Sequence, residues 1–117
     1  MKAAELVYKI ESADVWAEAQ ALGVYAGSAL DRTDGFIHFS TAAQVEATLR
    51  KWFAGRRALV LAAIDTATLG DKLRYEPARG GDLFPHLYAT LPMAAVRWTR
   101  PIKERADGSH ELGALEA

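Results

Sequence analysis

The stretch from Arg57 to Asp65 constrains the fold more than any other part of the sequence. Every residue between these two charged ends is apolar, in the order Ala-Leu-Val-Leu-Ala-Ala-Ile. A half-exposed strand alternates apolar and polar side chains, whereas a strand buried on both faces does not. The stretch therefore predicts a central strand at the core of a sheet.

Two other segments carry apolar residues at the three- and four-residue spacing of an amphipathic helix. The first, Ala13–Leu22, follows Ser12, whose hydroxyl can cap a helix. The second, roughly Ala42–Phe53, follows Thr41 and includes Trp52 on its apolar face. We therefore predict two main helices, with Ser12 and Thr41 as their N-terminal caps. Trp52 is expected to pack in the core or to be half-buried, rather than to stack on a ligand.

Shorter β-rich segments predict the remaining strands. They are Leu6–Ile10, Phe36–Ser40, Lys72–Glu76 and Ala94–Ile102. The glycine-containing stretches 27–35 and 78–82 are predicted to be loops, and the first of them could form a pocket wall. This pattern predicts one α+β domain, residues 1–117, in which two helices pack on a bent, mainly antiparallel sheet. We expect an ordered core over about residues 5–102 and a flexible tail over 103–117, where charged and small residues dominate.

Charge and composition disfavour several classes of function. The 117 residues have a formal net charge of −1 and include no cysteine. A nearly neutral chain lacks the charge that drives non-specific binding to nucleic acids or membrane surfaces. Without cysteine there is no disulfide, thiolate metal site or cysteine nucleophile. Because Glu5 interrupts the N-terminal region and no stretch reaches the length of a membrane span, we expect a cytoplasmic protein with no membrane partner.

The first candidate site segment is Gly35–Thr41. It places His38 on a predicted strand and two hydroxyl groups, those of Ser40 and Thr41, where the next helix is expected to begin. Alternation puts His38 and Ser40 on one face, and a helix N-terminus attracts anionic groups such as phosphate or carboxylate. The alternative is structural, with Thr41 as a simple cap and His38 as a core histidine.

The second candidate segment contains Arg74 and Glu76, which share one face of a predicted strand. A surface ion pair, worth about 0 to 1 kcal/mol, would explain the spacing. The functional alternative is an arginine that holds an anionic group beside a carboxylate that accepts a hydrogen bond from a ribose hydroxyl or acts as a base.

The third candidate segment, Phe84–Tyr88, places His86 in an apolar run after a glycine-rich loop. A partly buried imidazole needs hydrogen-bond partners. We expect His38, Glu76 and His86 to surround one concave site. Two histidines and one glutamate on separate elements lack the spacing of a metal-binding motif, so we predict no metal site.

Together these segments resemble the small bacterial family called domain of unknown function 952. The residues that carry the resemblance are Tyr8–Ile10, Trp16, Gly23–Tyr25, Asp34–Thr41, Gln44, Leu59–Asp65, Arg74–Glu76 and Phe84–Tyr88. The resemblance implies an α+β fold similar to that of the ADP-ribosyltransferases, which NAD-consuming transferases and RNA 2′-phosphotransferases share. The resemblance does not imply any known reaction.

The resemblance and the residue patterns give one set of candidate site residues. The catalytic candidates are Glu76, His38 and His86, and the ligand-binding candidates are Ser40, Thr41, Arg74, Lys9 and Tyr88. Lys9 stands where the family usually has a histidine after the tyrosine of the first strand. A lysine keeps a hydrogen-bond donor but lacks the flat ring and near-neutral titration of imidazole.

We therefore expect a small enzyme or nucleotide-binding domain with a small-molecule ligand, either NAD-like or a phosphorylated ribose. In the transferase scheme that the resemblance implies, Glu76 hydrogen-bonds the ribose and Ser40 helps to hold the leaving amide. Two alternatives stay open. One is a non-catalytic module that senses a small metabolite in the same cleft, and the other is a structural or partner-binding domain in which the polar residues only specify the fold.

Overall fold

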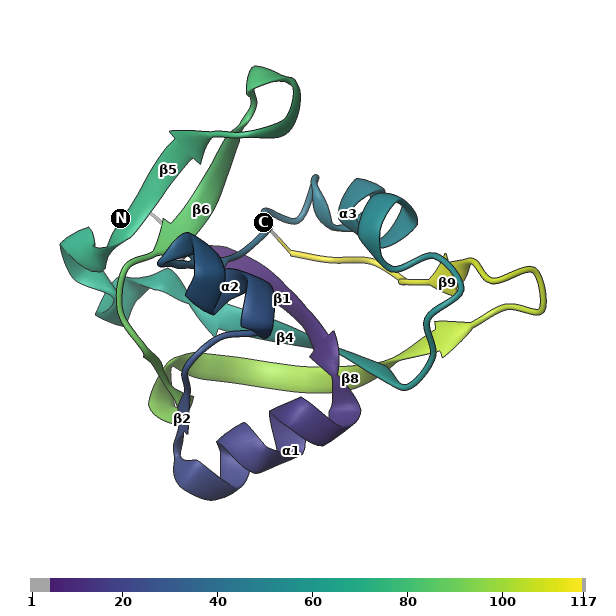
Figure 1. Ribbon diagram of the computed structural model, residues 1–117, viewed down its shortest axis with the longest axis horizontal. Helices are drawn as coiled ribbons and strands as arrows, with labels where there is room; N and C mark the ends of the chain where they lie inside the picture. Colours follow the sequence, from purple (N-terminus) through teal and green to yellow (C-terminus); the bar gives the residue numbers. More distant parts are fainter. Residues whose placement is uncertain (1–4, 117) are drawn as a thin grey trace.

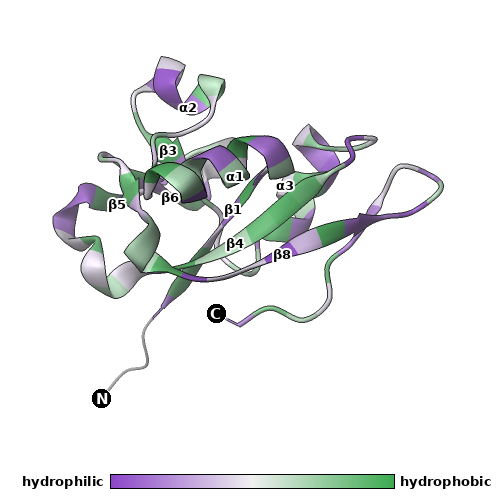
Figure 2. Cartoon of the chain, turned by 90° about the horizontal axis from the view of Figure 1, so that it is seen from below, coloured by the Kyte–Doolittle hydropathy of each residue, from purple (hydrophilic) through white to green (hydrophobic). Residues whose placement is uncertain are grey.

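The apolar stretch forms β4, Leu59–Asp65, in the interior of the main sheet (Figure 1). In the computed structural model, which describes residues 5–116, β4 pairs antiparallel with β1 (Leu6–Ser12) and β8 (Val96–Glu104). The short β9 (His110–Glu111) extends the sheet beyond β8. Residues 61–64 of β4 are completely buried, and Figure 2 shows that the strand is hydrophobic along most of its length. The predicted central strand is confirmed.

Alternate residues of β4 face two separate hydrophobic cores. Leu61 packs in the core that includes α3 (Val45–Trp52), whereas Ile64 packs in the core that includes α1 (Ala13–Leu22). The two helices therefore cover opposite faces of the main sheet (Figure 1). This explains why the sequence of β4 is apolar at every position between its ends.

A three-stranded sheet contains two of the candidate site segments. It consists of β3 (Ile37–His38), β6 (Leu83–Leu87) and β5 (Leu73–Pro77), in that order, and both pairings are antiparallel. Just after β3 the chain crosses to the main sheet, where Ser40 forms an antiparallel bridge with Tyr8 of β1. This crossing joins the two sheets into one curled antiparallel surface.

The remaining elements are short. β2 (Val24–Tyr25) pairs with β7 (Leu91–Pro92). Single 3₁₀ turns lie at Thr66–Thr68, Gly70–Lys72, Arg79–Gly81 and Met93–Ala95. None of the helices within residues 5–116 is long and apolar enough to cross a membrane.

The first predicted helix is confirmed, but the second begins later than predicted. α1 has the predicted bounds, and the Ser12 hydroxyl accepts a hydrogen bond from the Val15 backbone N–H. α3 begins at Val45, after a turn in which the side-chain oxygen of Gln44 accepts a hydrogen bond from the Thr41 backbone N–H. The prediction that Thr41 caps this helix is therefore wrong, and its hydroxyl does not lie at the helix N-terminus.

A third helix, α2 (Ala29–Asp34), occupies a stretch that we predicted to be a loop. The Ser28 hydroxyl accepts from the Asp31 backbone N–H, and the Asp31 carboxylate accepts from the Ser28 backbone N–H. This reciprocal capping box starts the helix, and Gly35 ends it in the left-handed conformation at φ 88°. The prediction took the polar and glycine residues here as loop signals and overlooked the serine and acidic residue three positions apart.

The segment after Lys103, predicted to be flexible, lies against the main sheet in this structure. Leu112 and Leu115 contact the core on the α3 side. The Arg100 guanidinium donates to the carbonyl oxygen of Leu112 at 2.9 Å. The prediction of a flexible tail was based on the charged and small residues of this segment, and it did not take the two leucines into account.

The position of β4 predicts a large cost for truncating its side chains. Leu61→Ala removes a completely buried side chain, so we expect the free energy of unfolding to fall by about 2–5 kcal/mol. The same substitution at Leu22, which is 77% exposed on α1, should change it by less than about 0.5 kcal/mol. Urea denaturation measures both values, and equal small losses would contradict the placement of β4 in the core.

Candidate functional site

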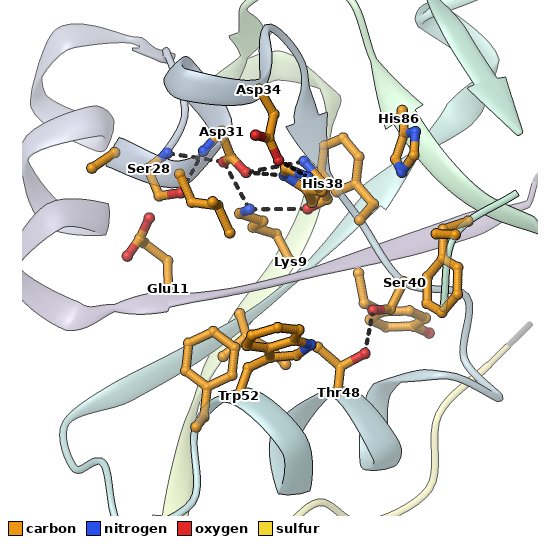
Figure 3. A pocket seen from close by; sticks show the side chains of 18 of the residues that line it. Lys9, Glu11, Ser28, Asp31, Asp34, His38, Ser40, Thr48, Trp52 and His86 are labelled. Carbon is orange, nitrogen blue, oxygen red and sulfur yellow. Dashed lines mark hydrogen bonds and ion pairs between the residues drawn. The ribbon is translucent and has the colours of Figure 1, made fainter. Parts of the chain in front are cut away.

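A cleft of about 660 Å³ lies along the outer edge of β1, between α2 and α3 (Figure 3). β1 pairs with β4 along one edge, and within residues 5–116 its other edge is bridged by Ser40. The volume falls in the usual range for small-molecule sites. Polar side chains come mainly from β1, α2, β3 and β6, and aromatic ones come from the end of α3 as well as from β1, β6 and the segment after β3.

Asp31, on α2, is the most deeply buried charged residue of the cleft, at 2% exposure. Its carboxylate accepts hydrogen bonds from Lys9 Nζ at 2.8 Å, from the Ser28 backbone at 2.9 Å, and from His38 Nδ1 at 2.6 Å. Burial alone would raise the pKa of Asp31, but the hydrogen bond from His38 and the charge of Lys9 outweigh it and hold the pKa well below its usual range. The ionised carboxylate therefore ties β1, α2 and β3 together.

Gly27 leaves the space that this carboxylate needs. Its φ is +103°, and a Cβ at this position would lie 2.8 Å from the Cβ of Asp31. Carbon atoms of side chains do not approach so closely, and other residues rarely adopt this backbone conformation. Only glycine fits here without moving Asp31.

His38 lies between two carboxylates. Its Nδ1 is 2.6 Å from Asp31 Oδ1, and its Nε2 is 3.0 Å from Asp34 Oδ2. A neutral imidazole has one N–H, so only the doubly protonated ring donates to both partners. The ring also lines the cleft, where Asp34 is the more exposed of its two carboxylate partners.

His86, on β6, is buried in the wall of the cleft, with its ring centroid 5.5 Å from that of His38. Its Nδ1 lies 2.8 Å from Glu76 Oε1, which also accepts from the Tyr88 hydroxyl at 2.7 Å. The hydrogen bonds from His86 and Tyr88 lower the pKa of Glu76. With Nδ1–H donating to the ionised Glu76, Nε2 carries the lone pair, and it has no hydrogen-bond partner within the described part of the chain. It is free to accept a proton or hydrogen bond from a ligand.

Phe36 holds both imidazoles in place. Its ring stacks on His86 with centroids 4.1 Å apart and contacts the ring of His38 at 4.6 Å. Aromatic contacts of this kind favour defined ring orientations. The two histidines are therefore fixed from one side by a shared hydrophobic ring and from the other by carboxylates.

The structure brings half of the predicted site residues to the cleft. Those that line it are Lys9, His38, Ser40 and His86. Glu76 and Tyr88 do not line it but connect to it through His86. The Arg74 guanidinium lies over the Tyr88 ring, 5.2 Å from its centroid, and Thr41 lies outside the lining.

Two of the predicted ligand-binding groups already have partners in the protein. Lys9 Nζ donates to Asp31 and also to the carbonyl oxygen of His38 at 2.9 Å. The Ser40 hydroxyl lies 3.1 Å from the Thr48 hydroxyl (Figure 3). Lys9 therefore supports the position of His38.

Four cleft residues were not among the predicted site residues: Asp31, Asp34, Glu11 and Trp52. The stretch that holds Asp31 and Asp34 was predicted to be a loop that could form a pocket wall, but neither residue was singled out. The capping box was the signal available for Asp31, and the two-residue spacing from Lys9 along β1 was the signal for Glu11. Trp52 was predicted to be in the core or half-buried, but it is 56% exposed and lines the cleft. Helical spacing alone does not show whether the last turn of a helix still packs against the core, and Trp52 is the last residue of α3.

Glu11 is also buried and hydrogen-bonded. Its carboxylate accepts from the Tyr25 hydroxyl and from the Ser12 backbone N–H. Burial and the hydrogen bond to Glu11 raise the pKa of Tyr25, so the hydroxyl stays protonated and donates. Glu11 is thus satisfied by the protein itself.

Comparison with known proteins gives a family without an assigned activity. Residues 10–99 match the family described as "Protein of unknown function (DUF952)". The crystal structure of the protein CC0527 from Caulobacter crescentus is similar to this chain with a TM-score of 0.88 and 44% sequence identity, over 92% of this chain and 95% of that one. The solution NMR structure of CC0527 gives a TM-score of 0.83 at 44% identity, over 92% and 93%. Both were structural genomics targets, and no curated protein matches.

The burial of Asp31 predicts a strong effect of removing its charge. Asp31→Asn keeps the shape but leaves the buried ammonium of Lys9 without its counter-charge, so the free energy of unfolding should fall by about 3–5 kcal/mol. Asp34→Asn, at a side chain that is 40% exposed, should cost less than about 1 kcal/mol. Urea denaturation near neutral pH compares the two, and losses of equal size would contradict the central role of Asp31.

The lowered pKa of Asp31 also predicts sensitivity to acid. Its pKa in the folded state lies below the ordinary unfolded value of about 3.9, so its stabilisation is fully present above that value and is lost as pH falls through the folded pKa. The free energy of unfolding of the wild type should therefore decrease below about pH 4, and that of Asp31→Asn should decrease less steeply. Urea titrations over this range measure both slopes. Parallel slopes would show that Asp31 does not couple folding to pH.

Proposed function

Because the chain belongs to the DUF952 family, whose description gives no activity, we propose a function from the cleft itself: it binds a small molecule, and His86 acts there as an acid–base catalyst. The observation that carries the proposal is the free Nε2 of His86 in the wall of the cleft, with Nδ1 held by Glu76 at 2.8 Å. An imidazole oriented by a carboxylate in this way is the usual arrangement of a histidine general base.

In the proposed chemistry, Nε2 of His86 accepts the proton of a ligand hydroxyl. Glu76 then stabilises the imidazolium that forms, so it acts as a positioning residue. When a ligand oxygen displaces the partly exposed Asp34, Nε2–H of His38 can donate to it and stabilise the negative charge that develops there. A proton acceptor and a proton donor on rings 5.5 Å apart suit a group-transfer or hydrolysis reaction.

NAD-like molecules and phosphorylated riboses are the first ligands to test. They follow from the resemblance to the ADP-ribosyltransferase fold, which remains a prediction. Both supply ribose hydroxyl groups, which match the acceptor on His86 and the donor on His38. In this proposal Glu76 acts through His86, whereas the transferase scheme places it directly on the ribose.

A thermal-shift screen identifies the ligand. The screen contains NAD, ADP-ribose, nucleotides and 2′-phosphorylated ribonucleotides, and a compound that binds the folded state raises the melting temperature. His86→Gln should abolish the shift or reduce it strongly, because it removes a ring that lines the cleft. A shift of equal size in this variant would place the ligand elsewhere.

Substitution of Glu76 separates catalysis from folding. Glu76→Gln removes a partly exposed charge and breaks no buried ion pair with Arg74, so the variant should melt close to the wild type. Turnover of the identified ligand should fall by about 100-fold, because His86 loses the carboxylate that orients it and stabilises its charge. Glu111→Gln, at an exposed position outside the cleft, is the matched control and should keep the wild-type rate. An unchanged rate in Glu76→Gln would contradict the role of the pair, and binding without any turnover would assign the cleft to a non-catalytic module.

A further inference from the structure

One end of the cleft takes no part in this chemistry. Trp52, Phe53 and Arg56 line the cleft at the end of α3 and in the turn that follows. Trp52 lies on the other side of β1 from the carboxylates of α2 (Figure 3). We propose that this end is a subsite for a flat ring linked to an anionic group. The inference rests on the proposed function, because it names the class of substrate that the same cleft takes.

Trp52 provides the surface for the ring. Its side chain is 56% exposed, although it is large and apolar, and Figure 3 shows it beside the open space of the cleft. The ammonium of Lys51 lies 5.6 Å from the centroid of its ring, which adds positive charge at this end. An exposed indole that lines a cleft offers the contact area that a flat ligand ring covers by stacking.

Arg56 provides the charge for the anion. Its guanidinium lies 5.0 Å from the centroid of the Phe53 ring and lines the cleft. Within residues 5–116 no carboxylate pairs with it, whereas the ammonium of Lys9, which also lines the cleft, is neutralised by Asp31 at 2.8 Å. A guanidinium without a counter-charge is suited to phosphate or carboxylate recognition.

The charges of the cleft set the direction of the ligand. Asp31 and Asp34 lie on the α2 side, and Trp52 lies on the α3 side (Figure 3). An anionic group is repelled by the former and attracted by Arg56 beside the latter. The ligand therefore places its ring and anion on the α3 side and its hydroxyl groups near His86.

Three probes test the two halves of this subsite. Adenosine 5′-monophosphate has a ring and an anion, adenosine has the ring alone, and ribose 5-phosphate has the anion alone. In ¹H–¹⁵N spectra, adenosine 5′-monophosphate should shift the indole N–H signal of Trp52 and leave that of the buried Trp16 in place.

Substitutions then separate the contributions. Trp52→Leu should weaken binding of adenosine 5′-monophosphate by about tenfold and leave ribose 5-phosphate unaffected. Arg56→Gln should weaken both phosphates by about tenfold and leave adenosine unaffected. Arg57→Gln is the matched control, because this neighbouring arginine is exposed and does not line the cleft. It should bind all three probes as the wild type does.

Two results would overturn the subsite: adenosine 5′-monophosphate does not bind, or it binds Trp52→Leu as tightly as the wild type. The ring signals of His38 and His86 distinguish this failure from that of the proposed function. A probe that shifts the histidine signals but not Trp52 overturns the subsite and leaves the acid–base proposal standing. A probe that shifts Trp52 but neither histidine supports the subsite and contradicts the acid–base proposal.

Discussion

The buried carboxylate of Asp31 is the interaction on which the cleft depends. A charge in the interior is costly unless each of its hydrogen bonds is made, and here the donors come from three elements: Lys9 on β1, Ser28 at the start of α2 and His38 on β3. None of these elements can move without leaving a buried charge or donor unsatisfied. His38 pairs directly with His86 across β3 and β6, and Asp31 fixes its ring so that the two ring centroids lie 5.5 Å apart.

The junction of the two sheets explains where the cleft forms. The bridge between Tyr8 and Ser40 brings the three-stranded sheet against the outer edge of β1, and α2 and α3 flank that edge on its two sides. An open strand edge attracts unwanted pairing, and flanking elements are a common protection. Here they also enclose a space lined by His38 and His86, which face each other across the β3–β6 pair of the three-stranded sheet. Glu76, on β5 of the same sheet, supports His86, and Asp31, on α2, supports His38.

Much of the fold could be predicted from the sequence, because the signals were local. The apolar run of β4 and the capped periodicity of α1 depend only on neighbouring residues. The start of α2 depends on two reciprocal hydrogen bonds between Ser28 and Asp31, and the late start of α3 depends on one from Thr41 to Gln44. The composition of the surrounding residues does not indicate either. In the site, the sequence pattern singled out His38, which lines the cleft, but the importance of Asp31 could not be predicted, since its partner Lys9 lies 22 residues away and the pairing follows from the three-dimensional fold.

The central claim is that His86 presents an unprotonated Nε2 to the cleft because Glu76 holds the proton on Nδ1. The most direct measurement is the tautomer of His86 in the wild-type protein, obtained from long-range ¹H–¹⁵N correlation spectra of the ring at about pH 8, above the ordinary imidazole pKa of about 6.5. The account predicts the Nδ1–H form, with the ¹⁵N shift of Nε2 typical of a bare nitrogen. A His86 ring protonated on Nε2 would contradict it, because no acceptor for a ligand proton would then face the cleft.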